Sequence, residues 1–256
     1  MSVSLSVQDK VAVITGGSRG IGAACVRMFV QAGAKVVFNY QRAKDAADKL
    51  VAECGPEHCH AVQADLNGTG DEKKLTDETI RRYSRVDILV ANHGIWPPND
   101  APIDEMLEEQ WHKTIAVNLD SVYLLVKHSV AAMKKQKSGG HVVLISSTAG
   151  QRGEAFHCDY AATKGAIISM VKGLSTELAP QNIRVNAVAP GWVWTDMTEP
   201  VLTDSKTRDS IYDKIAMGRV GTPEEIAGPV LFLCTPHAGF ITGEIFNVNG
   251  GAVLVG

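Results

Sequence analysis

Short apolar runs alternate with longer amphipathic stretches along the whole chain, and this alternation limits the folds open to it. The runs are nearly continuous and rich in β-branched residues, as is typical of strands covered on both faces. Longer helix-like stretches separate them and indicate βαβ units. We expect strands at 11–15, 35–40, 60–64, 87–91, 141–146, 183–189 and 244–249, and helices at 20–32, 43–53, 70–83, 108–136, 160–179 and 223–234.

This pattern predicts an α/β protein with a single Rossmann-type, doubly wound domain, whose mostly parallel seven-stranded sheet is flanked by helices. No linker or change of composition divides the 256 residues, so we expect one domain over 1–256. The least regular stretch is 191–218. A stretch that long inside a compact domain is more often functional than filler, and we expect a flap that covers the substrate.

Charge and composition exclude several classes of protein. The net charge is −3 and neither sign forms a run of five, which argues against a nucleic-acid partner. The uncharged stretch 226–243 contains two prolines and is too short for a membrane span, so no membrane partner is expected. Five cysteines without a C-x-x-C pair, and no signal-peptide pattern at the N-terminus, favour a cytoplasmic protein.

A glycine-rich turn, TGGSRGIG at residues 15–22, joins the first expected strand to the first expected helix. Gly16 permits a tight turn, Gly20 lets the backbone approach a pyrophosphate, and Gly22 lets the helix pack on the strand. A turn without a ligand is the alternative, but the βαβ context favours a nucleotide. We expect a dinucleotide bound by Gly16, Ser18, Arg19, Gly20, Ile21 and Gly22.

The end of the second expected strand bears on the choice of cofactor. An NAD site usually has an acidic residue about 20 positions after the glycines. Here residues 39–42 read NYQR, and the first acid is Asp45. Arg19 and Arg42 could neutralise a 2′-phosphate, although both arginines could equally be only solvated. We expect NADP(H) to be favoured over NAD(H).

Tyr160 and Lys164 are four residues apart at the start of an expected helix, so both project from one face. A cation about 4 Å from a phenolate stabilises it by up to about 4 kcal/mol at an effective dielectric near 20, or roughly 3 pK units. The lysine alone could then bring the phenol into working range as an acid or base. A chance Y-x-x-x-K pair is common, however, and its alternative is an ordinary surface tyrosine.

Five motifs in the right order make the chain similar to the short-chain dehydrogenase/reductase family over nearly its whole length. Residues 15–22 resemble the family's T-G-x-x-x-G-x-G, Tyr160 and Lys164 its Y-x-x-x-K, and residues 190–195 its P-G-x-V-x-T. The resemblance implies four catalytic residues, namely Asn118, Ser147, Tyr160 and Lys164. It implies cofactor contacts from Tyr40, Arg42, Asp65, Leu66, Asn92, Gly94, Tyr160, Lys164, Pro190, Gly191, Val193 and Thr195.

The resemblance also implies their roles. Tyr160 delivers a proton to the substrate oxygen while hydride passes from nicotinamide C4 to the carbonyl carbon. Lys164 lowers the pKa of the tyrosine and holds the nicotinamide ribose. Ser147 binds the developing alkoxide, and Asn118 positions a water that relays protons through Lys164. In relatives the two helices at 108–136 and near Tyr160 pack into dimers and tetramers, which implies a homotetramer or homodimer.

One motif departs from the family pattern. The family's N-N-A-G after the fourth strand reads Ala91-Asn92-His93-Gly94 here. Ala91 cannot make the hydrogen bonds of an asparagine side chain, which puts the local support of the sheet in question. His93 adds bulk and a titratable ring. We expect it to be packed or solvent-facing beside the cofactor, rather than to act in the site.

Two other groups of residues invite a functional reading. Cysteines and histidines at 54–60 lie in one place in the sequence, whereas a structural zinc site pairs two separate elements, so we expect no metal. Trp96, Trp192 and Trp194 follow expected strands, and Glu154 and His157 lie between Ser147 and Tyr160. Aromatic residues there either line a pocket or only pack the loops. We expect substrate contacts from Gln151, Phe156 and Trp192.

The sequence thus predicts an NADP(H)-dependent oxidoreductase that transfers hydride between nicotinamide and a carbonyl compound or secondary alcohol. Within the family it is similar to 3-oxoacyl-[acyl-carrier-protein] reductases. The alternatives are an NAD(H)-dependent sugar, polyol or steroid dehydrogenase, or a catalytically silent nucleotide-binding sensor. A sensor has no need of all four catalytic residues, which argues against it.

Overall fold

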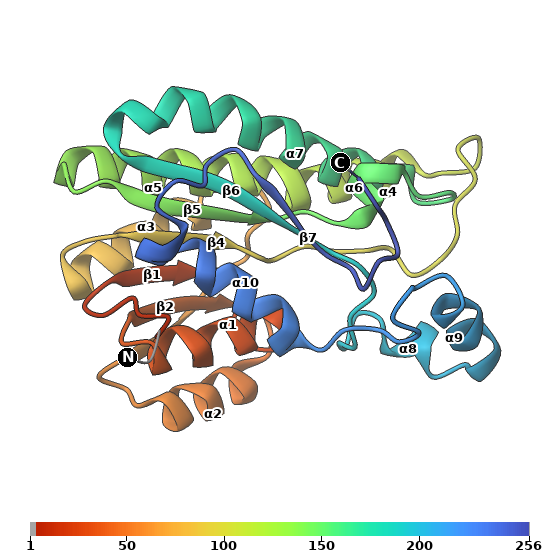
Figure 1. The fold of residues 1–256 in the computed structure, drawn as a ribbon, viewed down its shortest axis with the longest axis horizontal. Helices are drawn as coiled ribbons and strands as arrows, with labels where there is room; N and C mark the ends of the chain where they lie inside the picture. Colours follow the sequence, from red (N-terminus) through yellow and green to blue (C-terminus); the bar gives the residue numbers. More distant parts are fainter. Residues whose placement is uncertain (1–3, 256) are drawn as a thin grey trace.

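The computed structural model describes residues 4–255, whose seven strands form one sheet (Figure 1). The strand order is β3-β2-β1-β4-β5-β6-β7, and every neighbouring pair is parallel. The expected fold is confirmed, with a sheet that is wholly rather than mostly parallel. The strands are β1 (Val11–Ile14), β2 (Lys35–Tyr40), β3 (Cys59–Gln63), β4 (Ile88–Ala91), β5 (Gly140–Ile145), β6 (Ile183–Pro190) and β7 (Ile245–Val248).

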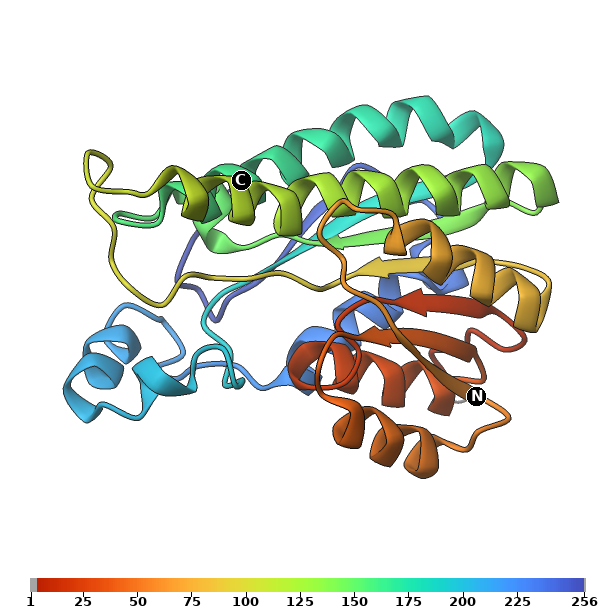
Figure 2. The same ribbon diagram turned by 180° about the vertical axis from the view of Figure 1, so that it is seen from behind.

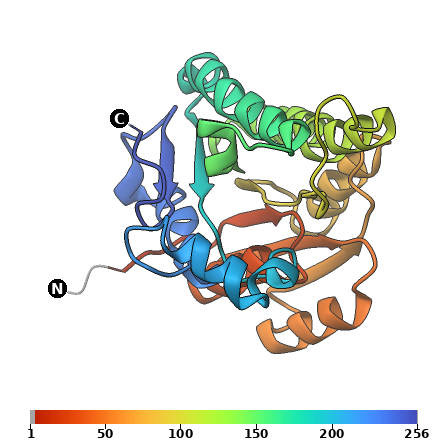
Figure 3. The same ribbon diagram turned by 90° about the vertical axis from the view of Figure 1, so that its right-hand side faces the viewer.

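Helices cover both faces of the sheet, and successive strand residues pack into different cores (Figure 3). Ala12 and Ile14 of β1 lie in the core shared with α1, α2 and α10, whereas Val13 lies in the core shared with α3, α5 and α7. Side chains of a strand point alternately to its two faces, which explains the nearly continuous apolar runs. These helices are α1 (Gly20–Gln31), α2 (Lys44–Cys54), α3 (Asp71–Tyr83), α5 (Ser121–Gln136), α7 (Cys158–Leu178) and α10 (Pro223–Leu233).

The prediction of a single helix at 108–136 is wrong in one respect, because this helix is interrupted. It consists of α4 (Glu108–Ile115), a π-helical turn (Ala116–Asp120) and α5. The turn holds one more residue than an α-helical turn, and Asn118 at its centre is fully buried. The side chain of Ser121 accommodates the change of register by donating to the Val117 carbonyl at 2.7 Å.

Residues 191–218, called the flap below, are more regular than their sequence pattern indicated. They contain α8 (Glu199–Leu202) and α9 (Ser205–Tyr212), and the Asp204 side chain caps α9. Leu202, Ile211 and Ile215 form a small core there with Val220. The flap and the loop 96–107 both project beyond the carboxyl ends of the strands (Figures 1 and 2).

The remaining helices are short. They are α6 (Thr148–Arg152) and two 3₁₀ turns (Ala179–Gln181 and Pro236–Ala238). Among the helices of residues 4–255, none has both the length and the apolar character that a membrane-spanning segment needs.

Candidate active site

The glycine-rich turn lies at the carboxyl end of β1 and opens α1. Gly16 and Gly20 have φ angles of 63° and 53°, in the left-handed region that favours glycine. A Cβ on Gly22 would lie 2.0 Å from the Gly16 carbonyl oxygen, so no side chain fits there. Within residues 4–255 the amides of Ser18 and Ile21 donate to no protein acceptor, and the first turn of α1 carries no acid. This helix N-terminus fits the pyrophosphate of a dinucleotide.

Asn39, near the end of β2, holds the glycine-rich turn in place. The Asn39 amide accepts from the Gly16 N–H at 2.8 Å and donates to the Ala64 carbonyl at 3.0 Å. Asn39 is therefore occupied in holding the backbone. Tyr40 is buried and Arg42 is exposed, so the segment after β2 carries an exposed cation where an NAD site usually has a carboxylate.

The first residues of the flap contact the glycine-rich turn. A Cβ on Gly20 would lie 3.3 Å from Thr195 Cγ2, which places the threonine against the turn. Arg19 forms an exposed ion pair with Asp196 at 3.2 Å. The second expected phosphate-binding arginine is thus paired with the flap in this state.

The other residues expected to contact the cofactor also follow strand ends and so lie along the same edge of the sheet. After β3 the Asp65 side chain is exposed and Leu66 is buried; after β4 the Asn92 side chain donates to the Thr15 carbonyl at 2.9 Å. The other expected cofactor contacts follow in chain order. Gly94 comes two residues after Asn92, Pro190 ends β6, and Gly191 and the buried Val193 come next.

Ser147, Tyr160 and Lys164 are brought together by α6 and α7. Ser147 is the N-cap of α6, and its hydroxyl accepts from the Ala149 amide at 3.1 Å. A Cβ on Gly150 would lie 2.5 Å from the Lys164 carbonyl carbon, so the two helices pack backbone against backbone. The Lys164 ammonium lies over the Tyr160 ring, 5.6 Å from its centroid.

Asn118 joins this group from the π turn. Its amide accepts from the Ile95 N–H and donates to the Ile95 carbonyl, both at 2.8 Å. A Cβ on Gly94 would lie 3.2 Å from Asn118 Oδ1 and 3.5 Å from Lys164 Nζ. All four expected catalytic residues therefore surround one point at the carboxyl edge of the sheet.

Burial dominates the ionisation of the tyrosine–lysine pair. It raises the pKa of Tyr160 to about 12; the charge of Glu154 acts in the same direction, and a hydrogen bond with Ser147 opposes it. Burial also lowers the pKa of Lys164 to about 8. The fall in the tyrosine pKa expected from the spacing is not seen, because the ammonium faces the ring and donates to the Ile145 carbonyl at 2.9 Å.

His93 is packed rather than solvent-facing, and it supplies support that Ala91 cannot. Thr15 Oγ1 accepts from the amides of Asn92 and His93, so its own proton goes to His93 Nδ1 at 2.8 Å. Nε2 then carries the ring proton and donates to Ser121 Oγ at 2.6 Å. Ser121 in turn bonds the π turn that presents Asn118. Sequence reasoning missed Ser121, because nothing in the sequence marks a π turn.

The three residues expected to contact the substrate are placed differently from one another. Gln151 Nε2 donates to Asn247 Oδ1 of β7 at 2.5 Å, so this side chain is tied to the sheet. Phe156 is 52% exposed at the connection between α6 and α7. Trp192 packs edge-on against Trp96 with a centroid separation of 6.0 Å.

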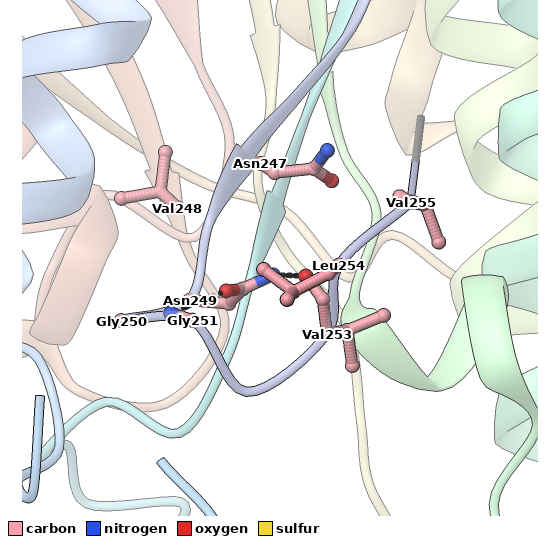
Figure 4. Close-up of a pocket in the computed structure, with 8 residues that line it drawn as sticks. All are labelled: Asn247, Val248, Asn249, Gly250, Gly251, Val253, Leu254 and Val255. Carbon is pink, nitrogen blue, oxygen red and sulfur yellow. Dashed lines mark hydrogen bonds between the residues drawn. The ribbon is translucent and has the colours of Figure 1, made fainter. Parts of the chain in front are cut away.

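Two hollows are lined by residues other than the four expected catalytic residues. One, of about 630 Å³, is lined by residues of the segment 247–255 alone (Figure 4). The other, of about 320 Å³, is bounded by Trp192, Met217 and Ile226, together with Val248. Across residues 4–255 no three His, Cys, Asp or Glu side chains are arranged to hold a metal ion.

Comparison with known proteins agrees with this geometry. Residues 16–253 match the family described as Enoyl-(Acyl carrier protein) reductase. The 3-oxoacyl-[acyl-carrier-protein] reductase of Synechocystis is 40% identical over 248 residues, 96% of this chain and 97% of the relative. The L-rhamnose 1-dehydrogenase (NAD(P)(+)) of Azotobacter vinelandii is 33% identical, covering 95% of this chain and 96% of the relative.

Among solved structures, a short-chain dehydrogenase/reductase of the glucose/ribitol dehydrogenase type from Brucella melitensis superposes with a TM-score of 0.90. The two sequences are 35% identical, and the superposition covers 99% of this chain and 100% of the Brucella chain. The chain therefore belongs to the short-chain dehydrogenase/reductase family, whose members transfer hydride between NAD(P) and CH–OH or C=O groups.

Proposed function

We propose that this protein is an NADP(H)-dependent reductase of 3-oxoacyl thioesters, such as those carried by an acyl carrier protein. The observation that carries the proposal is the grouping of Asn118, Ser147, Tyr160 and Lys164 beside a helix N-terminus that fits a pyrophosphate. The similarity to the Synechocystis reductase, along nearly the whole of both chains, supports this substrate class.

When bound, the nicotinamide supplies a hydride to the carbonyl carbon. Tyr160 delivers the proton to the carbonyl oxygen, and Ser147 donates a hydrogen bond to the developing alkoxide, an interaction worth about 3–4 kcal/mol in comparable sites. A phenol with a pKa of about 12 is protonated at neutral pH, which suits the reductive direction. Lys164 returns a proton to Tyr160, and Asn118 holds the water through which Lys164 is reprotonated.

The cofactor is proposed to lie along the carboxyl edge of the sheet. The turn 15–22 takes the pyrophosphate, Asp65 and Leu66 lie beside the adenine, and residues 190–195 wrap the nicotinamide. Lys164 and Tyr160 hold the nicotinamide ribose. The same edge of the sheet includes Tyr40, Asn92 and Gly94, which are proposed to contact the cofactor between its pyrophosphate and its ribose groups.

The preference for NADP(H) rests on the exposed Arg42 and on Arg19. Binding of a 2′-phosphate by Arg19 would compete with its ion pair to Asp196, which is exposed and therefore weak. We expect a higher kcat/KM with NADPH than with NADH. Replacing Arg42 with Ala should lower kcat/KM for NADPH by about tenfold and leave NADH use unchanged, and equal losses with both cofactors would contradict the assignment.

The substrate class is tested by following NADPH absorbance with acetoacetyl-coenzyme A, and then with acetoacetyl carried on an acyl carrier protein. Reduction of both supports the proposal. Tight NADPH binding without turnover of any carbonyl compound would instead favour a nucleotide-binding sensor.

A second candidate is an NAD(P)-dependent dehydrogenase of sugars or polyols. The L-rhamnose dehydrogenase of Azotobacter and the Brucella structure, both similar over nearly the full chain, support it. Oxidation of aldoses or ribitol at higher kcat/KM than reduction of acetoacetyl-coenzyme A would decide for this candidate.

The protein is further proposed to form a homodimer or homotetramer through α4, α5 and α7. Trp111 and Tyr123 leave apolar rings exposed on the first two of these helices. Light scattering coupled to size exclusion measures the state directly. We also propose a single domain over 1–256 with a mobile flap, and a cytoplasmic location, which the five free cysteines support.

A further inference from the structure

Aromatic rings join three loops that leave the sheet after different strands. The Trp96 ring, in the loop after β4, stacks on His157 with centroids 4.7 Å apart and an interplanar angle of 13°. Trp192, in the loop after β6, meets the Trp96 ring nearly at right angles, at 81° and 6.0 Å. These are contact separations for aromatic pairs, so no chain of atoms passes between the rings. We call Trp96, His157 and Trp192 the aromatic triad.

The triad is anchored to the backbone. His157 is 3% exposed, and its Nε2 donates to the Pro97 carbonyl at 2.8 Å. The Ala101 amide donates to the Phe156 carbonyl at 3.0 Å, so the loop after β4 is tied twice to the start of α7. Phe156 itself has a φ of 64°, a strained conformation for a bulky residue that its surroundings must hold. Such strain collects at binding sites.

The triad stands directly beside the proposed catalytic residues. His157 is the N-cap of α7, three residues before Tyr160. Trp96 follows Ile95, whose amide and carbonyl both bond to Asn118. Glu154 lies close to both Trp96 and Tyr160: burial raises the pKa of Glu154 and a hydrogen bond from the Trp96 indole opposes that rise, while the charge of Glu154 raises the pKa of Tyr160.

Trp192 links the triad to the flap. It comes directly after Gly191, and its partly buried side chain packs against the small core of the flap. A substrate whose carbonyl lies at Tyr160 would extend its chain between α7 and the flap. Through Trp96, the triad connects His157, the N-cap of α7, to Trp192 at the start of the flap.

We propose that the aromatic triad ends the substrate pocket and limits the length of the acyl group, so that the enzyme reduces short 3-oxoacyl groups and rejects long ones. The inference rests on the proposed function and names the substrate class within it. Trp96 is the central ring, in contact with both other members, and it acts here as a specificity-determining residue.

The test compares kcat/KM, with NADPH, for acetoacetyl and 3-oxodecanoyl thioesters of N-acetylcysteamine. The wild type should favour the short thioester by at least about tenfold, the scale on which a closed apolar pocket discriminates chain length. Trp96→Ala should raise kcat/KM for the long thioester by about tenfold and leave kcat for the short one within about threefold. Trp96→Leu, which keeps more of the packing, should act in the same direction.

The matched control is Phe240→Ala, which removes an exposed aromatic side chain that belongs neither to the triad nor to any proposed binding segment. It should keep the wild-type ratio of the two kcat/KM values. An unchanged ratio in both Trp96 variants would overturn the inference, as would a wild type that reduces both thioesters equally well. Failure of the wild type to reduce either thioester would overturn the proposed function, and the inference with it.

Discussion

His93 should make the stability of this protein depend on pH between neutrality and pH 5. Burial, aided by the charge of Lys164, lowers the pKa of His93 to about 3 from its ordinary value of 6.5. The folded protein therefore keeps His93 neutral at a pH where the unfolded chain protonates it. The stability from this group is fully present above 6.5 and is lost as the pH falls towards 3.

The size of the effect follows from linkage. Each pH unit below 6.5 costs about 1.4 kcal/mol of unfolding free energy, so about 2 kcal/mol is lost between pH 7 and pH 5. Replacing His93 with Gln removes the titration but leaves one acceptor for Thr15 and one donor for Ser121. The variant should therefore lose about 2 kcal/mol less than the wild type over this interval.

Urea unfolding at pH 7 and pH 5, at one fixed protein concentration, measures the difference. His141, whose pKa burial lowers to about 4, contributes to both proteins and cancels. The matched control is His58→Gln, whose side chain is 54% exposed and which should behave as the wild type does. Equal losses of stability in His93→Gln and the wild type would show that burial does not hold the ring neutral in the folded protein.

Three further predictions concern the proposed catalytic and cofactor sites. Tyr160→Phe should reduce kcat at least about 100-fold while NADPH affinity, measured by fluorescence titration, stays within about twofold; unchanged turnover would remove the tyrosine from the mechanism. Gly22→Ala would place a Cβ 2.0 Å from the Gly16 carbonyl oxygen, and it should abolish the rise in Tm that NADPH gives; a normal rise would contradict this packing. The rate of reduction should fall above about pH 8 as Lys164 loses its proton. A rate that stays unchanged up to pH 10 would refute that role of Lys164.

Most of the sheet could be predicted because each parallel strand is buried on both faces and so must be apolar throughout. Val11 to Ile14 are all buried, for example, which is what a continuous apolar run means physically. The carboxyl ends of such strands share one edge, so the residues that follow them could be grouped from order alone.

The details that the sequence left open depend on contacts between distant residues. The π turn at 116–120 has the same apolar spacing as the helices around it. It is favoured only when the Asn118 side chain forms its hydrogen bond with Ile95. The left-handed Phe156 and the tautomer of His93 are likewise set by partners from other loops. The position of the Lys164 ammonium over the ring follows from a carbonyl 19 residues away, which no local spacing indicates.

The π turn also constrains the length of the chain. One extra residue rotates everything after it by about 100° relative to a regular helix. Consequently α4 packs on α7 whereas α5 packs on α3, although the two follow one another without a loop. Deleting a single residue from 116–120 would restore a regular helix and turn one of the two apolar stripes away from its partner. At this point the number of residues is constrained as well as the identity of Asn118.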